Sequence, residues 1–285
     1  MARHSHRLRA LALPRVSRGR LIIDALTPGR THRYGPHRAQ RAELHLPAGR
    51  GPHPVMILIH GGSWQARYGK IVMRGLAGDL VRRGWAAWNI EYRRVGDGGG
   101  WPATFEDVAA AVDHLADVQA PIDLERATVL GHSAGGHLAL WAASREQLPP
   151  GAPGAPDGEP AVPLRRAIAQ AGVCDLTGAY RLWGGNAARR LMGGGPDELP
   201  ERYAIGDPMR LLPPACPVLL VHGVSDELVA ISITRSYADA ARDAGAEVEL
   251  VEVTGPDGRH SAHVDPRTAA WAAVSSRLAE PAQVQ

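Results

Sequence analysis

The segment Gly-His-Ser-Ala-Gly at residues 131–135 places a serine hydroxyl between two glycines. An apolar run before it, Ala127–Leu130, predicts a strand, and the pattern of Ala134–Gln147 after it predicts a helix. On such a tight turn a serine adopts strained backbone angles and projects its hydroxyl above the sheet, and glycine neighbours avoid collisions there. This context predicts that Ser133 is a nucleophile for acyl transfer.

A serine hydroxyl becomes reactive only when a base removes its proton, and a carboxylate must orient that base. After the predicted strand Val218–Val221 the chain reads His-Gly-Val-Ser-Asp-Glu, so Asp226 lies just beyond a carboxyl end. In parallel sheets that end carries the active crevice. Asp226 is therefore predicted to orient the base, with a turn or cap role as the alternative. Glu227 is expected to face elsewhere.

Two histidines follow the predicted strand Glu247–Val253, in the chain order serine, acid, histidine that this arrangement uses. His260 lies early in the loop, two residues after Gly258. His263 lies nearer to the last predicted helix. We predict that His260 is the general base and keep His263 as its alternate.

The strand predicted at Val55–Ile59 ends in His-Gly-Gly-Ser-Trp. Glycines at this place allow backbone N–H groups to point at a developing oxyanion. The amides of Gly62, Ser63 and Ala134 are the predicted donors. Trp64 is expected either to line the substrate pocket or to be a core aromatic residue.

The elements needed to position these residues alternate along the chain. Strands are predicted at 41–46, 55–59, 85–92, 127–130, 166–171, 218–221 and 247–253, and helices at 71–83, 105–117, 134–147, 231–244 and 266–278. Such alternation predicts an α/β fold, with a mostly parallel, eight-stranded type of sheet and helices on both faces. Residues 149–163, rich in Pro and Gly, are expected to form an exposed loop.

The series is interrupted at about residues 172–214, which are irregular and rich in glycine. We expect this segment to be a small cap inserted over the sheet, and residues 21–285 to be one domain. Trp183 within it is a candidate wall of the substrate pocket. Asp265 and Pro266 are expected to begin the last helix.

Four segments resemble the α/β-hydrolase fold, within it the esterase and lipase group that carries an HGG oxyanion motif. They are HGGSW at 60–64, EYRRVGDGGGWPATFEDV at 91–108, GHSAGGHLALW at 131–141 and HGVSDELV at 222–229. The resemblance extends to feruloyl-esterase-like, hormone-sensitive-lipase-like and kynurenine-formamidase-like proteins. HSAHVDP at 260–266 is similar to the family's histidine stretch, and its alignment on Asp265-Pro266 puts the family's histidine on His260. HGGSW lacks the usual third glycine of the lipase-like group, so the motif does not determine the substrate class.

These residues and the resemblance together imply a serine hydrolase that cleaves carboxylic esters of short to medium acyl chains through an acyl-enzyme. No cofactor or metal is required for this chemistry. A formamidase or amidase with the same triad is the alternative. A ligand-binding protein without catalysis is a further alternative, although such a protein would normally have lost a triad member.

Composition limits the other classes. The net charge is +3, but residues 1–20 hold six arginines and no acid, so the remainder carries a net −3. A near-neutral domain with a basic tail does not indicate nucleic-acid binding, and no apolar run is long enough to span a membrane. The tail is expected to be disordered and lacks a signal-peptide core, so a cytoplasmic location is expected by default. The expected partner is a small ester or amide, and the sequence leaves room for a homodimer.

Overall fold

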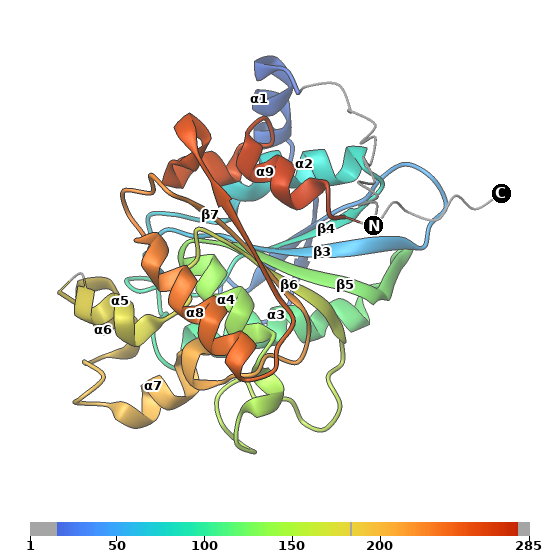
Figure 1. The fold of residues 1–285 in the computed structure, drawn as a ribbon. Coiled ribbons are helices and arrows are strands. Elements are labelled where there is room, and N and C mark those ends of the chain that lie inside the picture. Colours follow the sequence, from blue (N-terminus) through green and yellow to red (C-terminus); the bar gives the residue numbers. More distant parts are fainter. Residues whose placement is uncertain (1–15, 183, 279–285) are drawn as a thin grey trace, which may run out of the picture.

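The computed structural model describes residues 16–182 and 184–278, and within this part of the chain a sheet of eight strands runs through the centre (Figure 1). The strand order is β1-β2-β4-β3-β5-β6-β7-β8. The strands are β1 (Arg30–Arg33), β2 (Arg41–His45), β3 (His53–Ile59), β4 (Ala86–Ile90), β5 (Ile122–His132), β6 (Leu164–Gln170), β7 (Val218–Gly223) and β8 (Val248–Val253). Only β1 with β2 and β2 with β4 pair antiparallel. The predicted α/β fold with a mostly parallel sheet is confirmed.

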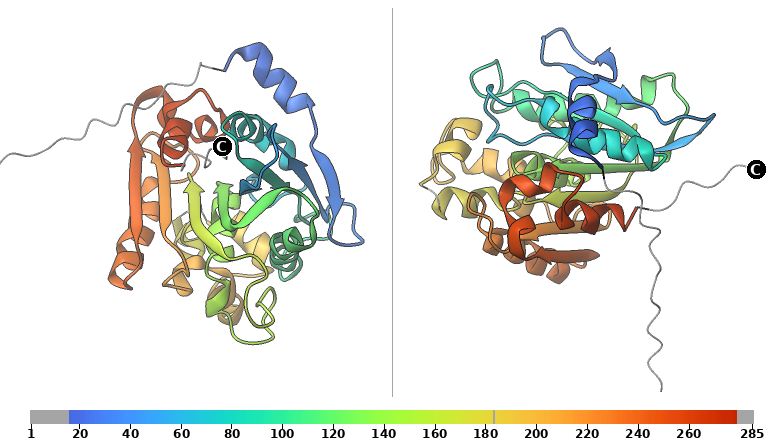
Figure 2. Two further views of the ribbon diagram at one scale, coloured as in Figure 1. Left: turned by 90° about the vertical axis from the view of Figure 1, so that its right-hand side faces the viewer. Right: turned by 90° about the horizontal axis from the view of Figure 1, so that it is seen from above.

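Helices cover both faces of this sheet (Figure 2). The described α-helices are α1 (Arg18–Leu26), α2 (Arg74–Arg82), α3 (Ala103–Asp113), α4 (Ala134–Ala142), α5 (Leu176–Leu182), α6 (Asn186–Met192), α7 (Pro200–Gly206), α8 (Ile231–Asp243) and α9 (Ala269–Ser275). Short 3-10 helices are η1 (Lys70–Met73), η2 (His114–Asp117), η3 (Arg145–Gln147), η4 (Pro208–Arg210), η5 (Gly255–Gly258) and η6 (His260–Val264). None of these helices has both the length and the apolar character needed to cross a membrane.

Two apolar cores lie on opposite faces of the sheet. One contains Trp88, Phe105 and Tyr237 and joins the sheet to α3, α4 and α8. The other contains Leu80 and Trp271 and joins the sheet to α2 and α9. Every residue of β3 is buried, because β4 and β5 flank this strand and helices cover both of its faces. The segments that carry the predicted site residues therefore follow strands with a fixed position.

The segment between β6 and β7, predicted as a cap, folds into α5, α6, α7 and η4. A buried carboxylate ties its two ends together. Asp207 accepts hydrogen bonds from the amides of Leu176 and Thr177, both at 2.9 Å, and from the Thr177 hydroxyl at 2.7 Å. The insertion therefore leaves the sheet after β6 and is anchored again shortly before β7.

Several boundaries differ from the prediction. The last helix begins at Ala269 instead of Pro266, because Thr268 caps it by accepting from the Trp271 amide, whereas the Asp265 carboxylate is held by Arg267. The 149–163 loop is not wholly exposed, since Val162 is buried. Residues 1–15 of the predicted tail lie outside the described residues, but Arg18–Leu26 is helical, so the tail does not extend to residue 20.

Candidate active site

Ser133 occupies the turn between β5 and α4 in a strained conformation, with φ 57° and ψ −121°. The adjacent glycines make this turn possible. A Cβ on Gly131 would lie 1.9 Å from the Gly135 carbonyl oxygen, and a Cβ on Gly135 would lie 2.1 Å from the Ile59 carbonyl oxygen. The turn thus brings the serine to the carboxyl edge of the sheet, at the N-terminus of α4.

Asp226 contacts His260 directly. Its Oδ2 atom lies 2.8 Å from Nδ1 of His260, and its Oδ1 atom accepts from the amides of Leu228 and Val229 at 2.9 and 2.8 Å. Burial alone would raise the pKa of Asp226, but hydrogen bonds from His222 and His260 outweigh burial and hold the pKa well below its usual value. The carboxylate is therefore ionised and held in contact with the His260 imidazole.

The alternate histidine faces another way. His263 is fully buried, and its Nδ1 lies 3.2 Å from the carbonyl oxygens of Arg259 and His260. Burial lowers the pKa of His263 to about 4, so the ring is neutral at physiological pH. His260 lines the pocket that contains Ser133, and His263 is not among the lining residues.

Two further histidines surround this pair and were not singled out from the sequence. Nε2 of His222 lies 3.3 Å from Oδ2 of Asp226, and its Nδ1 lies 2.6 Å from the Thr234 hydroxyl. Nε2 of His132 lies 3.1 Å from the His260 carbonyl oxygen, and burial lowers the pKa of His132 well below its usual value. The sequence offered a way to find both. His132 lies directly before Ser133 in the 131–135 motif, and His222 lies in the same motif as Asp226.

The loop after β3 adopts positive φ angles at three successive residues, 111° at Gly62, 52° at Ser63 and 57° at Trp64. A Cβ on Gly62 would lie 2.4 Å from the Tyr68 side chain, so only glycine fits there. Among the hydrogen bonds of the described residues, none uses the amide of Gly62, Ser63 or Ala134 as donor. All three residues line the pocket, and their amides are available to a ligand.

A buried polar network packs against this loop and holds its backbone. Nε2 of His60 lies 2.7 Å from Oε1 of Glu91, and its ring stacks on Tyr92 with centroids 4.4 Å apart. The Tyr92 hydroxyl donates to the His60 carbonyl at 2.9 Å. Burial raises the pKa of Glu91, but the nearby His60 and Arg94 outweigh it and keep that pKa below its usual value. The network fixes the backbone from which the loop amides project.

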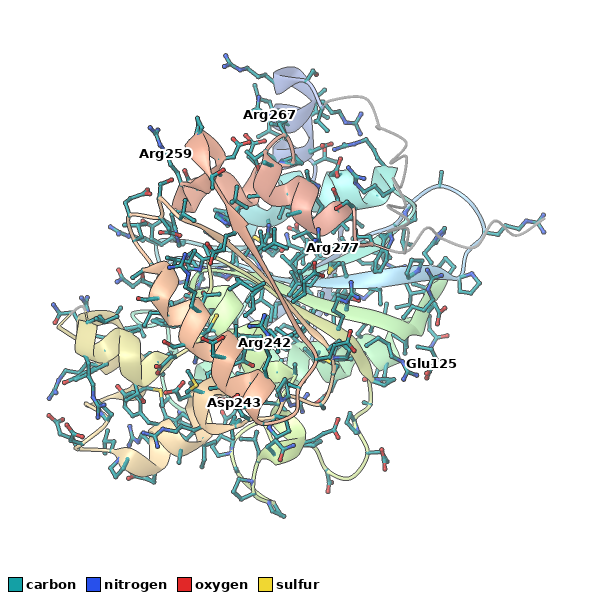
Figure 3. All side chains as sticks on the ribbon, viewed as in Figure 1. Glu125, Arg242, Asp243, Arg259, Arg267 and Arg277 are labelled. Carbon is teal, nitrogen blue, oxygen red and sulfur yellow. The ribbon has the colours of Figure 1, made fainter. Side chains whose placement is uncertain are left out.

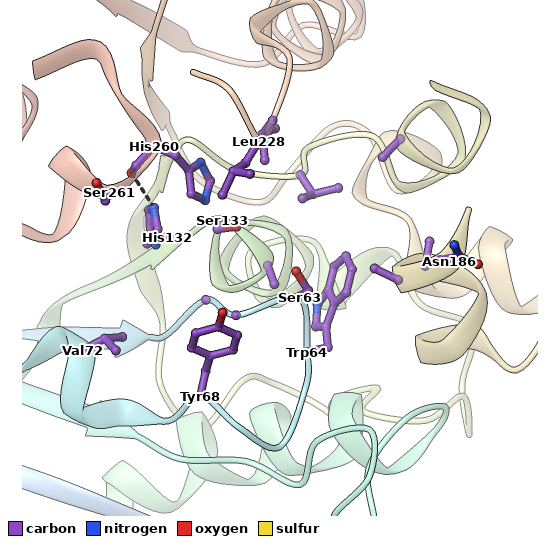
Figure 4. Close-up of a pocket in the computed structure, with 18 of the residues that line it drawn as sticks. Ser63, Trp64, Tyr68, Val72, His132, Ser133, Asn186, Leu228, His260 and Ser261 are labelled. Atoms are coloured by element: carbon purple, nitrogen blue, oxygen red, sulfur yellow. Dashed lines mark hydrogen bonds between the residues drawn. The ribbon is translucent and has the colours of Figure 1, made fainter. Parts of the chain in front are cut away.

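The pocket has a volume of about 450 Å³ (Figure 4). Its lining combines the serine, the histidine and the loop glycines with apolar side chains that include Trp64, Tyr68, Val72, Val173, Leu228 and Val264. The 172–214 insertion contributes Ala179, Tyr180 and Asn186. Trp64 is both a pocket residue and a core residue, being 3% exposed. Trp183, the other predicted wall, lies outside the described residues.

Solved structures of several esterases share this fold. A truncated carbohydrate esterase from gut microbiota has a TM-score of 0.71 and 20% identity, with 84% of this chain and 92% of that chain covered. Esterase B from Lactobacillus rhamnosis, inhibited by a tributyrin phosphonate, has a TM-score of 0.70 and 22% identity, with 86% and 82% covered. A thermophilic esterase from the Planctomycetes species Thermogutta terrifontis has a TM-score of 0.68 and 20% identity, with 87% and 90% covered.

Sequence comparison identifies the family. Esterase LipQ of Mycobacterium tuberculosis is 29% identical over 217 residues, which are 73% of this chain, and the chain spans about half of that relative's length. These relatives are all named as esterases, which agrees with the predicted carboxylic ester hydrolase activity. The family model BD-FAE matches residues 43–240, from within β2 to within α8, and this range includes the motifs around Ser133 and Asp226. The chain therefore belongs to the BD-FAE family of the α/β-hydrolase fold.

Proposed function

We propose that the protein is a serine esterase that cleaves carboxylic esters of short to medium acyl chains. The observation that carries this proposal is the 2.8 Å contact between Asp226 and His260 at the edge of the pocket that also holds the strained Ser133. A nucleophile, a base and a carboxylate that orients the base are the minimum set for acyl transfer. Each comes from a different loop at the carboxyl edge of the sheet.

The reaction proceeds in two steps. His260 takes the proton of Ser133 as the hydroxyl oxygen attacks the ester carbonyl, and the resulting oxyanion accepts hydrogen bonds from the amides of Gly62, Ser63 and Ala134. His260 then donates the proton to the leaving alcohol, and an acyl-enzyme remains on Ser133. Water, activated by the same histidine, releases the acid. Asp226 stays ionised throughout and stabilises the imidazolium.

The pocket supports a short or medium acyl group as the substrate. Its volume of about 450 Å³ is in the lower part of the range for small-molecule sites, and apolar side chains form most of its wall. Trp64 and Tyr180 lie on that wall, and the 172–214 insertion closes one side of the pocket. We propose that this insertion selects the acyl chain.

Turnover of p-nitrophenyl acetate, butanoate and octanoate, compared with N-formylkynurenine, tests the substrate class. The expected result is efficient hydrolysis of the esters with a preference for acetate or butanoate, and little turnover of the formamide. A kcat/KM for N-formylkynurenine above that for every ester would establish the amidase alternative. Ser133→Ala, with the hydroxyl removed, serves as the matched background for each substrate.

A further inference from the structure

The pocket extends to both sides of Ser133. Figure 4 shows Trp64 and Asn186 on one side of this serine, and Tyr68 and Val72 on the other side. We call the part beside Trp64 and the 172–214 insertion the insertion half of the pocket. The part beside Tyr68 and Val72 is called the outer half. The two halves differ in their walls, so they can hold different parts of a substrate.

The insertion half is enclosed. Its apolar walls belong to the core on the α3, α4 and α8 face of the sheet and are at most 5% exposed; they include Trp64, Val173, Ala179 and Ala188. The Trp64 indole meets the ring of His137 edge-on, with centroids 5.3 Å apart, and Nε2 of His137 lies 2.7 Å from the Gly206 carbonyl oxygen on α7. These contacts fix the wall, so the length of a group that enters this half is limited.

The outer half is open to solvent. Tyr68 and Val72 on its wall are 39% and 40% exposed. Val264 of η6 also lines the pocket, and it packs against the other core, on the α2 and α9 face of the sheet. A Cβ on Gly75, three residues after Val72, would lie 3.8 Å from the Val264 carbonyl oxygen, so α2 and η6 lie side by side. The outer half therefore has an apolar wall without a cover.

Tyr68 is held in place as part of this wall. A Cβ on Gly62 would lie 2.4 Å from the Cβ atom of Tyr68, so the tyrosine packs directly on the loop that follows β3. The Tyr68 amide donates to the Gln65 carbonyl at 3.2 Å, and the Tyr68 carbonyl accepts from Nη1 of Arg94. The wall of the outer half is thus formed before any substrate binds.

The lining of the pocket indicates an uncharged occupant. Among the described residues, no Asp, Glu, Lys or Arg side chain lines the pocket. Arg259 and Arg267 lie on either side of η6 in the chain, but both lie at the outer surface of the molecule (Figure 3). Arg67 stacks on the Tyr68 ring at 4.8 Å from its centroid and is not a lining residue. A charged group in the pocket would lose hydration without gaining an ion pair.

The chemistry of ester cleavage decides which part of the substrate each half receives. As the bond between the carbonyl carbon and the alkoxy oxygen breaks, His260 donates its proton to that oxygen. The alcohol part must therefore lie on the side of His260, within hydrogen-bond reach of its ring. Ser261 and Val264, which follow His260 in η6, line this side of the pocket. The acyl group, bonded to the same carbon, then turns away from the histidine into the insertion half.

We propose that the outer half binds the alcohol part of the ester, and that Tyr68 and Val72 select bulky, uncharged, apolar alcohols. This inference rests on the proposed esterase function and adds a substrate class to it. The favoured substrate joins a short or medium acyl group, limited by the insertion half, to a larger apolar alcohol. Tyr68 and Val72 are specificity-determining residues that contact the leaving group.

Esters that differ only in the alcohol test this assignment. Methyl, butyl and hexyl acetate share one acyl group, and their alcohols have nearly equal acidity, so differences in kcat/KM report binding of the alcohol part. Methyl butanoate, compared with methyl acetate, reports the acyl part. The test variants are Tyr68→Ala and Val72→Thr, of which the second keeps the shape of the side chain. The matched control is Ile71→Thr, since Ile71 lies on the same 3-10 helix as Val72, is 58% exposed and does not line the pocket.

We expect the unmodified chain to prefer hexyl acetate to methyl acetate by about tenfold in kcat/KM. Tyr68→Ala should abolish this preference, Val72→Thr should lower it about fourfold, and Ile71→Thr should leave it unchanged. The preference between methyl butanoate and methyl acetate should be the same in all four proteins, because the acyl group lies in the insertion half.

Two outcomes would overturn the assignment of the outer half alone. A change in the butanoate preference, with the hexyl preference intact, would place the acyl group against Tyr68 and Val72. Equal losses for every ester, methyl acetate included, would show that Tyr68 acts through the loop after β3 and that the alcohol does not touch it. Absence of turnover for all four esters by the unmodified chain would instead refute the proposed esterase function, and the alcohol site with it.

Discussion

At the scale of single residues, the two histidines of the 260–263 segment differ in the group that each one faces. His260 meets Asp226 and lines the pocket, whereas His263 meets two backbone carbonyls. We expect His260→Gln to lower kcat about 1000-fold or more, because the serine loses its base, and His263→Gln to lower kcat far less. Steady-state kinetics with a chromogenic ester, beside melting temperatures for both variants, decides between them. The reverse ranking would move the base to His263.

We expect His222 to position the same carboxylate. Its Nε2 approaches both Asp226 and the Val229 carbonyl, at 3.3 and 2.9 Å. Because a lost hydrogen bond to a charged group costs about 1.5–3 kcal/mol, His222→Phe should lower kcat about 10- to 100-fold with little change in KM. His222→Gln retains a donor and should recover part of the rate. A loss confined to the melting temperature, with kcat intact, would show that His222 only packs.

At the scale of elements, the turn between β5 and α4 depends on the absence of side chains. Gly135→Ala would place a methyl group 2.1 Å from the Ile59 carbonyl oxygen, so the loop that carries Ser133 must shift. We expect a kcat/KM at least about 100-fold lower, since a small misplacement of a nucleophile has effects of this size. Gly19→Ala is the matched control, because nothing lies within 4 Å of its Cβ and its φ is not positive. Equal activity of both variants would contradict the role of the turn.

Elements with a strong apolar pattern could be predicted from the sequence. The β3 run is apolar on both faces because the strand is central, and α8 shows helical spacing with one buried face. In contrast, α1 and β1 were not predicted. The inward residue of α1 is the charged Asp24, and β1 is a four-residue edge strand of sequence Arg-Thr-His-Arg. The apolar residues Ile22, Ile23 and Leu26 of α1 face solvent, so their spacing does not identify a side that packs on the core, and β1 has no apolar residue at all.

In the candidate site, local motifs could be predicted from the sequence, whereas contacts between distant segments depend on the fold. Ser133 and the loop at 60–64 could be predicted because each lies within a local motif whose glycines are needed by the backbone. Asp226 and His260 were predicted as a pair from their positions after successive strands and from the family resemblance, but their contact joins residues 34 positions apart and depends on the pairing of β7 with β8. The contact of His222 with Asp226 depends on the turn after β7, and spacing alone does not specify that turn.

At the scale of the whole molecule, buried neutral histidines make stability depend on pH. Burial lowers the pKa of His137 and His263 to about 4, and that of His132 well below the ordinary value of 6.5. Between about pH 6.5 and 4 the unfolded chain therefore binds protons that the folded chain does not. The free energy of unfolding should fall as the pH is lowered through this range, by about 1.4 kcal/mol per pH unit for each such histidine.

Urea unfolding at pH 7.5, 6 and 5 measures this dependence. A variant with one fewer buried imidazole, His137→Phe, should show a shallower slope between pH 6.5 and 5 than the unmodified chain. A free energy of unfolding that does not change over this range would mean that these histidines titrate alike in the folded and unfolded states.

The central claim is that acyl transfer occurs on Ser133, and the site of covalent modification tests it most directly. The protein and its Ser133→Ala variant are incubated with a fluorophosphonate, digested, and mapped by mass spectrometry. Because only a serine activated by His260 attacks the phosphorus quickly, the account predicts one adduct, on Ser133, together with loss of ester turnover and no adduct in the variant. An adduct on another residue, or undiminished ester turnover in Ser133→Ala, would contradict it.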